Sequence, residues 1–438
     1  MRHIDTLIIG GGQAGLAMSR SLTERGVEHV VLERGRVGER WHSERWDSLT
    51  LLTSRKLSRL SGWAGDPVAT SRGAAESADP EGFMDREEVI RYLDGYRDHF
   101  DIPVHTGVSV TYVERDGEGY RVETNQDDWR AERVVIATGE SQSPFVPCMA
   151  RDLSGAIHQV VTTRYKNPDQ LPDGRVLVVG ASATGIQLAR EIHASGRPVT
   201  LSVSRHTRLP RRYRGRDILD WFDVMGILDE SSEQVRNLTA SREQPSMQLV
   251  GSSDHQTLDL RVLQDEGVRL VGRAEGGAGP RMVFADDLVE SLAGADMKLA
   301  GLRLRIDRFI RTRGMDGEVG PEEPFSPMPL PEAPTRLDLR AEGIGTVLWA
   351  TGFKRSYPWL RVPVLSAAGE IRHQGGITSA AGLYVLGLNF MRRRSSSFIA
   401  GVAKDAEELA DHLVRTRTRR GGVGDPRSDR AEPARAVA

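Results

Sequence analysis

Two glycine-rich turns constrain this chain more than any other feature, because each one closes a short apolar run that is typical of a buried strand. The first turn is Gly10-Gly11-Gly12-Gln13-Ala14-Gly15, and the second, about 170 residues later, is Gly180-Ala181-Ser182-Ala183-Thr184-Gly185. Glycine lets the backbone bend sharply and lets a pyrophosphate approach, while the following helix offers free N–H groups to the anion. One such turn is weak evidence. Two of them predict an α/β fold with two Rossmann-like dinucleotide-binding domains in one polypeptide.

The residue that ends the strand after each turn indicates which nucleotide binds there. Glu33 lies 18 residues after Gly15, where a carboxylate accepts hydrogen bonds from the ribose hydroxyls of an adenosine. The alternative for Glu33 is a solvated acid at a strand end. In the second unit Ser204 lies 19 residues after Gly185 and is followed by Arg205.

A guanidinium binds the 2′-phosphate of NADPH, which a carboxylate would repel. Ser204 and Arg205 therefore predict NADPH at the second turn. The alternative is a solvated basic loop, because six arginines fall between Arg205 and Arg216. Arg205 is favoured because it is nearest to the strand end.

Two further apolar strands end in the same three residues. Residues 133–139 close with Ala137-Thr138-Gly139, and residues 346–353 contain Ala350-Thr351-Gly352. Such an ending would place a tight backbone turn beside a bound cofactor, although an ordinary strand followed by a turn is the alternative.

The order of these motifs predicts an FAD domain into which an NADPH domain is inserted. We expect residues 1–165 to form the first part of the FAD domain and 166–340 to form the NADPH domain with a helical insertion. Residues 341–415 would complete the FAD domain, and 416–438, rich in Arg, Gly, Asp and Ala, would be a disordered tail. Residues 287–311 have the apolar periodicity of a long amphipathic helix.

Composition excludes several classes of function. The 438 residues carry a net charge of −2, without the positive excess of a nucleic-acid-binding chain. No apolar run is long enough to span a bilayer, and the first strand begins too early for a signal peptide. We therefore expect a cytoplasmic enzyme without a membrane or nucleic-acid partner, and the sequence leaves open whether copies of the chain associate.

The cysteine and histidine contents limit the chemistry. Cys148 is the only cysteine, so a disulfide within the chain and a dithiol redox cycle are both excluded. The eleven histidines show no spacing typical of metal ligands, so no metal site is expected.

Taken together, these motifs resemble the class B flavin-dependent monooxygenases, which include flavin-containing N- and S-oxygenases, Baeyer–Villiger enzymes and plant auxin-forming enzymes. The resemblance rests on the paired turns, on Gly38-x-x-Trp41, and on the two Ala-Thr-Gly strands with Pro144-x-x-Pro147 and Tyr357-Pro358-Trp359-Leu360. It spans residues 4–415 and implies FAD and NADPH as cofactors. Besides the residues of the turns and of the Ala-Thr-Gly strands, it implies cofactor contacts from Arg34, Arg40, Trp41, Thr53, Val108 and Gly387.

The resemblance also implies a reaction. NADPH would reduce FAD, O₂ would add to the reduced flavin, and the flavin hydroperoxide would pass one oxygen to a small organic substrate. N- or S-oxygenation, hydroxylation and Baeyer–Villiger oxidation all fit. Because the flavin carries the chemistry, no side chain is assigned a catalytic role.

Two departures from the family pattern stand out. The family's identifying stretch, an aromatic-x-Gly element followed by a histidine and an aromatic residue, is degenerate here. It begins at Leu153 and ends at Tyr165, with Val161 at the histidine position. Relatives of the N-oxygenating type place an Asn near the flavin where this chain has Leu52, which removes a polar group that would hold the nicotinamide and the oxygenated flavin.

Two other functions remain open on the sequence. The weakened motifs are compatible with an NADPH-dependent flavin oxidase or reductase on the same scaffold. A non-catalytic redox or nucleotide sensor is the more remote reading, because two turns and two Ala-Thr-Gly strands exceed what sensing requires.

Overall fold

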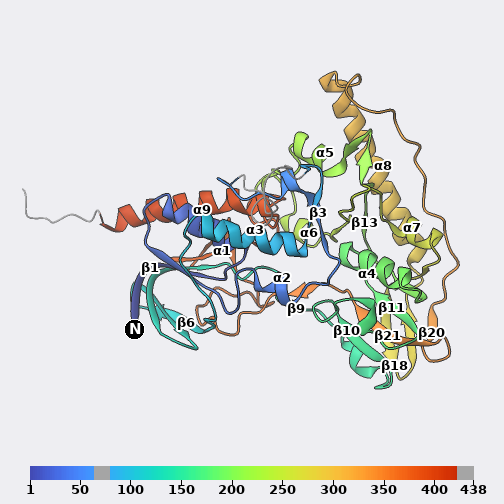
Figure 1. Cartoon of the computed structure of the whole chain (residues 1–438), viewed down its shortest axis with the longest axis horizontal. Coiled ribbons are helices and arrows are strands. Elements are labelled where there is room, and N and C mark those ends of the chain that lie inside the picture. Colours follow the sequence, from blue (N-terminus) through green and yellow to red (C-terminus); the bar gives the residue numbers. More distant parts are fainter. Residues whose placement is uncertain (64–78, 422–438) are drawn as a thin grey trace, which may run out of the picture.

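The computed structural model describes residues 1–63 and 79–421, which form two lobes joined at a narrow waist (Figure 1). The lobe that contains the N-terminus is built on a nine-stranded sheet, and the other lobe on a five-stranded sheet. Each sheet contains one of the glycine-rich turns, so the predicted α/β class with two Rossmann-like units is confirmed.

The sheet of the first unit has a parallel centre of five strands in the order β25-β8-β1-β2-β5. A β-hairpin, β23-β24, continues it antiparallel at one edge, and the meander of β6 and β7 pairs with β8. The strands are β1 (Arg2–Ile9), β2 (His29–Leu32), β5 (Val104–His105), β6 (Val110–Asp116), β7 (Gly119–Thr124), β8 (Trp129–Ile136), β23 (His373–Gln374), β24 (Ile377–Thr378) and β25 (Leu383–Val385).

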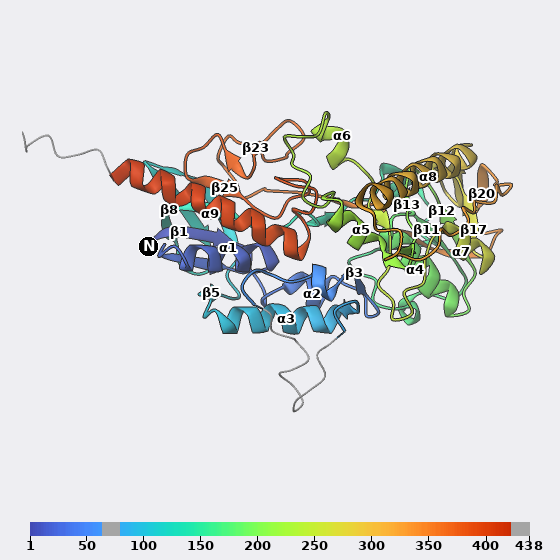
Figure 2. The ribbon, with the colours of Figure 1, turned by 90° about the horizontal axis from the view of Figure 1, so that it is seen from above.

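Helices cover the first sheet and bury its apolar strands. The helices α1 (Gln13–Thr23) and α9 (Ile399–Gly421) lie side by side, with α3 (Arg86–His99) on the other side of α1 (Figure 2). Leu16 and Leu22 of α1 join Leu409 and Leu413 of α9 in one buried cluster with strand β1. The last helix of the chain is therefore part of the core of the first unit.

The second sheet is entirely parallel, in the order β10-β21-β11-β12-β17. Successive residues of β11 point into different clusters: Val176 and Val178 pack toward α4, and Leu177 and Val179 toward a small antiparallel sheet. Burial on both faces is typical of parallel sheets. The elements are β10 (His158–Val161), β11 (Arg175–Val179), α4 (Ala183–Ala194), β12 (Val199–Ser202), α7 (Leu260–Asp265), β17 (Arg269–Val271), β18 (Ala274–Ala278), β19 (Arg281–Phe284), β20 (Arg336–Asp338) and β21 (Ile344–Trp349).

Between β12 and α7, and again between β19 and β20, the second unit carries additional segments. The predicted amphipathic helix is α8 (Leu288–Arg313), whose Ile306 and Ile310 pack on Ile218 and Trp221 of α5. Ile218 and Trp221 are therefore part of the core of the second unit. The remaining elements here are β13 (Thr207–Arg208), β14 (Arg212–Tyr213), β15 (Arg216–Asp217), α5 (Ile218–Val224), α6 (Leu238–Arg242) and β16 (Met247–Gln248).

The strand pairing corrects the predicted borders between the two units. β10 lies before residue 165 and β21 after residue 341, yet both belong to the second sheet, where they pair with each other. The chain leaves the first unit at β9 (Ser143–Pro144) and returns at β22 (Phe353–Lys354), two short strands that pair antiparallel at the waist. The predicted borders of 165/166 and 340/341 therefore do not follow the strand pairing, because the second sheet takes in strands from both sides of them.

The first unit also carries α2 (Glu39–Ser43), β3 (Thr50–Ser54), the short 3₁₀ helix Arg55–Leu57 and β4 (Phe83–Asp85). At the other end of the chain α9 continues to Gly421, so the first six residues of the predicted disordered tail are helical. The rest of that predicted tail lies outside the described residues.

Candidate functional site

The two glycine-rich turns have the same backbone geometry. Gly10 has φ +111° and Gly180 has φ +109°, a region that favours glycine. A Cβ at Gly10 would lie 2.6 Å from the carbonyl oxygen of Ala137, and one at Gly180 would lie 2.4 Å from that of Ala350. Each turn thus packs against the Ala of its own Ala-Thr-Gly strand, so Ala350, Thr351 and Gly352 accompany the second turn.

The last glycine of each turn allows the helix to pack on its strand. A Cβ at Gly15 would lie 1.9 Å from the carbonyl oxygen of Gly10, and a Cβ at Gly185 would lie 1.8 Å from that of Gly180. The middle position is different. A Cβ at Gly12 would meet no protein atom within 4 Å, so the protein itself leaves open space at the mouth of the first turn.

Both turns present helix N-termini without a side-chain cap. Gly12 and Ser182 are the N-cap residues of α1 and α4, with nearly equal backbone angles, and neither helix receives a capping hydrogen bond from a side chain. By contrast, Asp85 and Asp259 cap α3 and α7. Uncapped N–H groups beside open space suit a pyrophosphate, so both turns fit the predicted dinucleotides.

Glu33 lies beside the first turn, at the carboxyl end of β2. Its carboxylate accepts hydrogen bonds from the backbone N–H groups of Gly11, at 2.7 Å, and Gly35, at 2.9 Å. The side chain is buried, which excludes the reading as a solvated strand-end acid. The buried Val108 completes this wall by donating its N–H to the carbonyl of Glu33 at 2.9 Å.

Two other predicted contact residues of the first cofactor, Arg40 and Gly387, contact the first turn or the loop after its Ala-Thr-Gly strand. Arg40 donates to the carbonyls of Ser141 and Gln142, directly after the first Ala-Thr-Gly strand. Desolvation by burial lowers the pKa of Arg40. A Cβ at Gly387, at the end of β25, would lie 2.8 Å from the Cβ of Ala14.

The remaining predicted residues differ in how close they lie to this turn. Thr138 accepts a hydrogen bond from Gln142 at 3.0 Å, whereas Trp41 packs between the cores of the two units. Thr53 is buried in β3 with its hydroxyl 2.6 Å from that of Ser58. Arg34 is exposed and forms an ion pair with Glu44 at 3.3 Å.

At the second turn, Ser204 and Arg205 follow the carboxyl end of β12. Arg205 is exposed and makes no ion pair or side-chain hydrogen bond within the described residues. Several neighbouring arginines are structural. Arg208 binds Asp259 and Asp296, and Arg211 binds Asp217. The loop is therefore more than a solvated basic segment, and Arg205 remains available to a ligand.

Leu52 of β3, the position at which the resemblance implies an Asn in N-oxygenating relatives, serves as packing in this structure. Its side chain is half-buried against the apolar cluster of α5 and α8, beside Leu57 and Phe398. Its carbonyl accepts a hydrogen bond from Arg211 at 2.9 Å. The first unit thereby contributes an apolar surface to the boundary between the units.

Two polar residues that follow the first Ala-Thr-Gly strand were not predicted from the sequence. Glu140 accepts a hydrogen bond from the backbone N–H of Asn389 at 2.8 Å, and desolvation by burial raises the pKa of its carboxyl. Gln142 donates to the carbonyl of Gly139 at 2.9 Å and accepts from the N–H of Ser356 at 2.8 Å. Their position directly after Gly139 was the only signal in the sequence.

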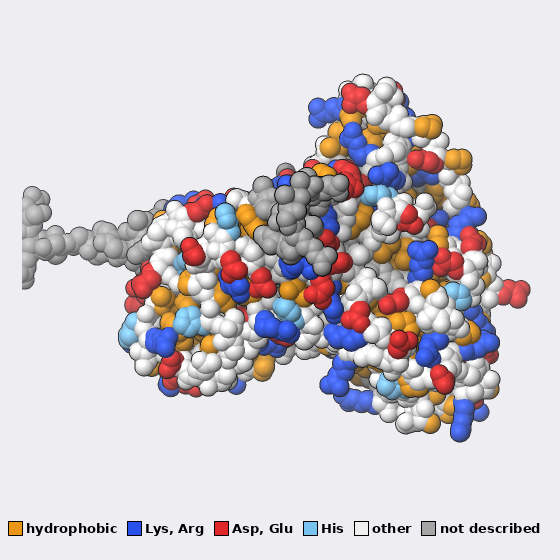
Figure 3. All heavy atoms as spheres, viewed as in Figure 1, with side chains coloured by type: hydrophobic (Ala, Val, Ile, Leu, Met, Phe, Trp, Pro, Cys, Tyr) orange, Lys and Arg blue, Asp and Glu red, His pale blue; other side chains and the backbone are white. Residues whose placement is uncertain are grey.

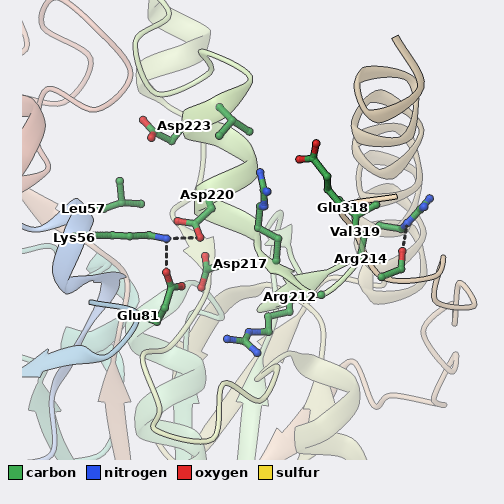
Figure 4. A pocket seen from close by; sticks show the side chains of 14 residues that line it. Lys56, Leu57, Glu81, Arg212, Arg214, Asp217, Asp220, Asp223, Glu318 and Val319 are labelled. Atoms are coloured by element: carbon green, nitrogen blue, oxygen red, sulfur yellow. Dashed lines mark hydrogen bonds and ion pairs between the residues drawn. The ribbon is translucent and has the colours of Figure 1, made fainter. Parts of the chain in front are cut away.

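A cavity of about 680 Å³ lies between the two units (Figure 4). Lys56 of the first unit reaches across it and binds both Glu81, on its own unit, and Asp220 of α5. Arg214, which also lines it, is paired with Asp307. Many of the charged groups around this cavity are thus already neutralised by protein partners.

Comparison with known proteins identifies the family. A family described as pyridine nucleotide-disulphide oxidoreductase matches residues 7–217. An uncharacterized CzcO-like oxidoreductase of Geobacillus kaustophilus is 32% identical over 419 residues, covering 94% of this chain and 99% of the relative. The indole-3-pyruvate monooxygenase YUCCA4 of Oryza sativa subsp. japonica is 25% identical over 434 residues, covering 93% and 87%. The chain belongs to the family of this CzcO-like oxidoreductase, and it is similar over most of its length to a flavin-dependent monooxygenase.

The fold agrees with this membership. A flavin-containing monooxygenase from Stenotrophomonas maltophilia aligns with a TM-score of 0.65 at 19% identity, over 95% of this chain and all of that one. FAD and NADPH, the cofactors predicted from the sequence, are those of the flavin-dependent monooxygenase family. The disulphide named in that family description cannot form within this chain, because its only cysteine is the exposed Cys148.

The remaining expectations concern membrane-spanning helices, metal sites and surface charge. Among the described residues no helix is both long and apolar enough to cross a membrane. Within the same residues, no group of three or more His, Cys, Asp or Glu side chains could hold a metal ion. On the face seen in Figure 3, basic and acidic side chains alternate over both lobes.

Proposed function

We propose that this chain is an NADPH-dependent FAD monooxygenase that inserts one oxygen atom of O₂ into a small organic substrate. The observation that carries the proposal is the repetition of one geometry in two sheets. Both turns have the same backbone, the same uncapped helix N-terminus and an Ala-Thr-Gly strand alongside. One polypeptide thereby offers two dinucleotide sites with different strand-end residues, Glu33 and Arg205.

The chain's own residues would divide the work between the two sites. The first turn would hold the FAD pyrophosphate on the N-terminus of α1, while Glu33 binds the adenosine ribose. The second turn would hold NADPH on α4, and Arg205 would bind its 2′-phosphate. When bound, the cofactors supply hydride transfer and oxygen activation, so the protein must orient them and exclude water.

The protein's side chains also fix the surroundings of the flavin crevice. Gln142 ties the first Ala-Thr-Gly turn to the chain that returns at Ser356, which lies just past β22. Arg40 fixes the same loop from α2. Leu52 and Phe398 present apolar surface from the first unit toward the second. A single exposed cysteine fits a reducing compartment such as the cytoplasm.

Purified protein should carry non-covalent FAD and should oxidise NADPH. Amines, thioethers and ketones would be tested as substrates while NADPH consumption, oxygenated product and hydrogen peroxide are followed together. Product in stoichiometric amount supports the proposal. Stoichiometric peroxide with every substrate would instead indicate an oxidase, and binding without turnover would indicate a sensor. Protein that takes up no FAD on reconstitution would refute the whole proposal.

A further inference from the structure

The loop between β25 and α9, residues 386–398, contacts both the first dinucleotide turn and the second unit. At its start, Gly387 packs on Ala14 of the first turn. At its end, the carbonyl of Ser397 accepts a hydrogen bond from Gln13 at 3.2 Å. The loop therefore borders the crevice at the carboxyl ends of the parallel strands, where such sheets bind their ligands.

The second unit contacts this loop through residues 227–244, which we call the clasp. Backbone hydrogen bonds join Leu228 to Ser395 at 3.0 Å and Ser232 to Arg392 at 2.8 Å. An ion pair at 2.5 Å joins Glu230 to Arg394 of the loop. The clasp is thus attached to a loop of the first unit at several consecutive residues.

One chain of hydrogen bonds leads from the first Ala-Thr-Gly turn into the clasp. Glu140, the residue after Gly139, accepts the backbone N–H of Asn389 at 2.8 Å. The side chain of Asn389 donates to the carbonyl of Arg242 in the clasp at 3.2 Å. The guanidinium of Arg242 returns two hydrogen bonds to the carbonyl of Phe390, each at 3.3 Å.

Glu140 is an unusual group for a purely structural contact. Its carboxylate is partly buried, and desolvation raises its pKa. The cation that acts on it most strongly, Arg355, forms its own ion pair with Glu370 at 2.5 Å. Among the described residues the Glu140 carboxylate has no ion-pair partner, so the hydrogen bond from Asn389 is its main compensation for the cost of desolvation.

We propose that Glu140 is a positioning residue, which holds Asn389 and, through Asn389 and Arg242, sets the clasp and the second unit against the flavin crevice. This inference rests on the proposed function, because the position of the second unit matters only if it delivers a nicotinamide to the flavin. Hydride transfer depends steeply on the separation and orientation of the two rings, and a misplacement of about 1 Å can cost about 100-fold in rate.

The test compares Glu140→Ala, Glu140→Gln and the matched control Glu132→Ala, which removes an exposed carboxylate from β8, the strand that leads to Glu140. Hydrogen exchange is measured first, with and without FAD. Glu140→Ala should raise exchange in both the loop 386–398 and the clasp. Glu140→Gln, whose amide oxygen still accepts the N–H of Asn389, and Glu132→Ala should exchange like wild type.

Rapid mixing of the FAD-loaded protein with NADPH then separates binding from hydride transfer. Glu140→Ala should lower the limiting rate of flavin reduction about 10-fold, while the dissociation constant for NADPH changes less than about twofold. Glu140→Gln should restore most of the rate. Asn389→Ala, which removes the amide that donates to the carbonyl of Arg242, should reproduce the slow reduction and serves as the test if Glu140→Ala does not fold.

If Glu140→Ala shows the hydrogen exchange and the rate of flavin reduction of wild type, the inference is overturned. Loss of FAD affinity in that variant with an unchanged clasp would overturn it as well, because Glu140 would then hold the cofactor and not the second unit. If NADPH fails to reduce even the wild-type flavin, the proposed function fails. The exchange measurements would still decide whether Glu140 holds the clasp.

Discussion

Comparing Gly12→Ala with Gly15→Ala would distinguish a glycine that is needed for ligand binding from one that is needed for the fold. Gly12 has φ −89°, a conformation open to any residue, and its added Cβ would touch no protein atom within 4 Å. Gly15, three residues later, would place its Cβ 1.9 Å from a backbone oxygen. The two substitutions are chemically identical, yet the structure predicts different effects on the stability of the apo protein.

The apo protein should tolerate Gly12→Ala. The substitution loses only the preference for glycine over alanine at a helix N-cap, which is worth about 1 kcal/mol or less. Gly15→Ala must instead push α1 away from the turn, and overpacking of this kind costs about 1–3 kcal/mol. Thermal unfolding of the two apo variants should therefore show a clear loss of stability only for Gly15→Ala.

FAD binding should be affected by both substitutions. If the pyrophosphate lies against Gly12, the new methyl group displaces it and weakens at least one hydrogen bond to a charged group, worth about 1.5–3 kcal/mol. That corresponds to roughly 10- to 150-fold in the dissociation constant. FAD titration followed by the change in flavin fluorescence measures it. Wild-type affinity in Gly12→Ala, or a large loss of apo stability, would refute the assignment of the open space to the pyrophosphate.

Four further outcomes are expected from single changes elsewhere. Glu33→Ala should weaken FAD binding by about 1.5–3 kcal/mol in the same titration, and unchanged affinity would remove Glu33 from the site. Arg205→Ala should raise the KM for NADPH about 10–100-fold and leave that for NADH nearly constant; equal shifts in both would make Arg205 part of the basic loop only. Wild type should release hydrogen peroxide when substrate is absent, and Leu52→Asn should reduce this leak. A lower melting temperature with an unchanged leak would mean that Leu52 only packs. His373, whose pKa burial lowers to about 4, accepts the N–H of Gly376 and is therefore held neutral. Because the unfolded chain binds this proton more readily, stability should fall as the pH drops from about 6.5 to about 4, by about 3 kcal/mol at most. His373→Asn should reduce that fall in acid unfolding curves, and identical curves would contradict the assignment.

Local features of the fold could be predicted well from the sequence. Glycine positions define each turn within six residues, and the apolar spacing of α8 is visible within its own length. The position of Glu33 beside the first turn followed from its offset from that turn, whereas its burial is a finding of the structure. Each of these inferences depends on neighbours that lie close together in the chain.

Long-range pairing could not be predicted in the same way. The residues of β10 and β21 carry no local signal that assigns them to a sheet, and only the pairing of β21 with β10 and with β11 places both in the second. The hydrogen bond between Glu140 and Asn389 joins residues 249 positions apart. No local pattern indicates that such residues meet, so both the domain borders and this link required the structure.

The pairing of β9 with β22 has a consequence for the order in which the chain can fold during synthesis. Every strand of the second sheet has been made once residue 349 leaves the ribosome. The first sheet, although it begins at residue 2, must wait for β25 and for the apolar face of α9 near the end of the chain. We therefore expect the inserted unit to become protease-resistant on stalled nascent chains before the unit that precedes it, the reverse of the usual N-terminal-first order. Until then the strands β1 and β8 expose apolar surface, so we expect truncations that remove α9 to cause aggregation of the N-terminal half of the protein.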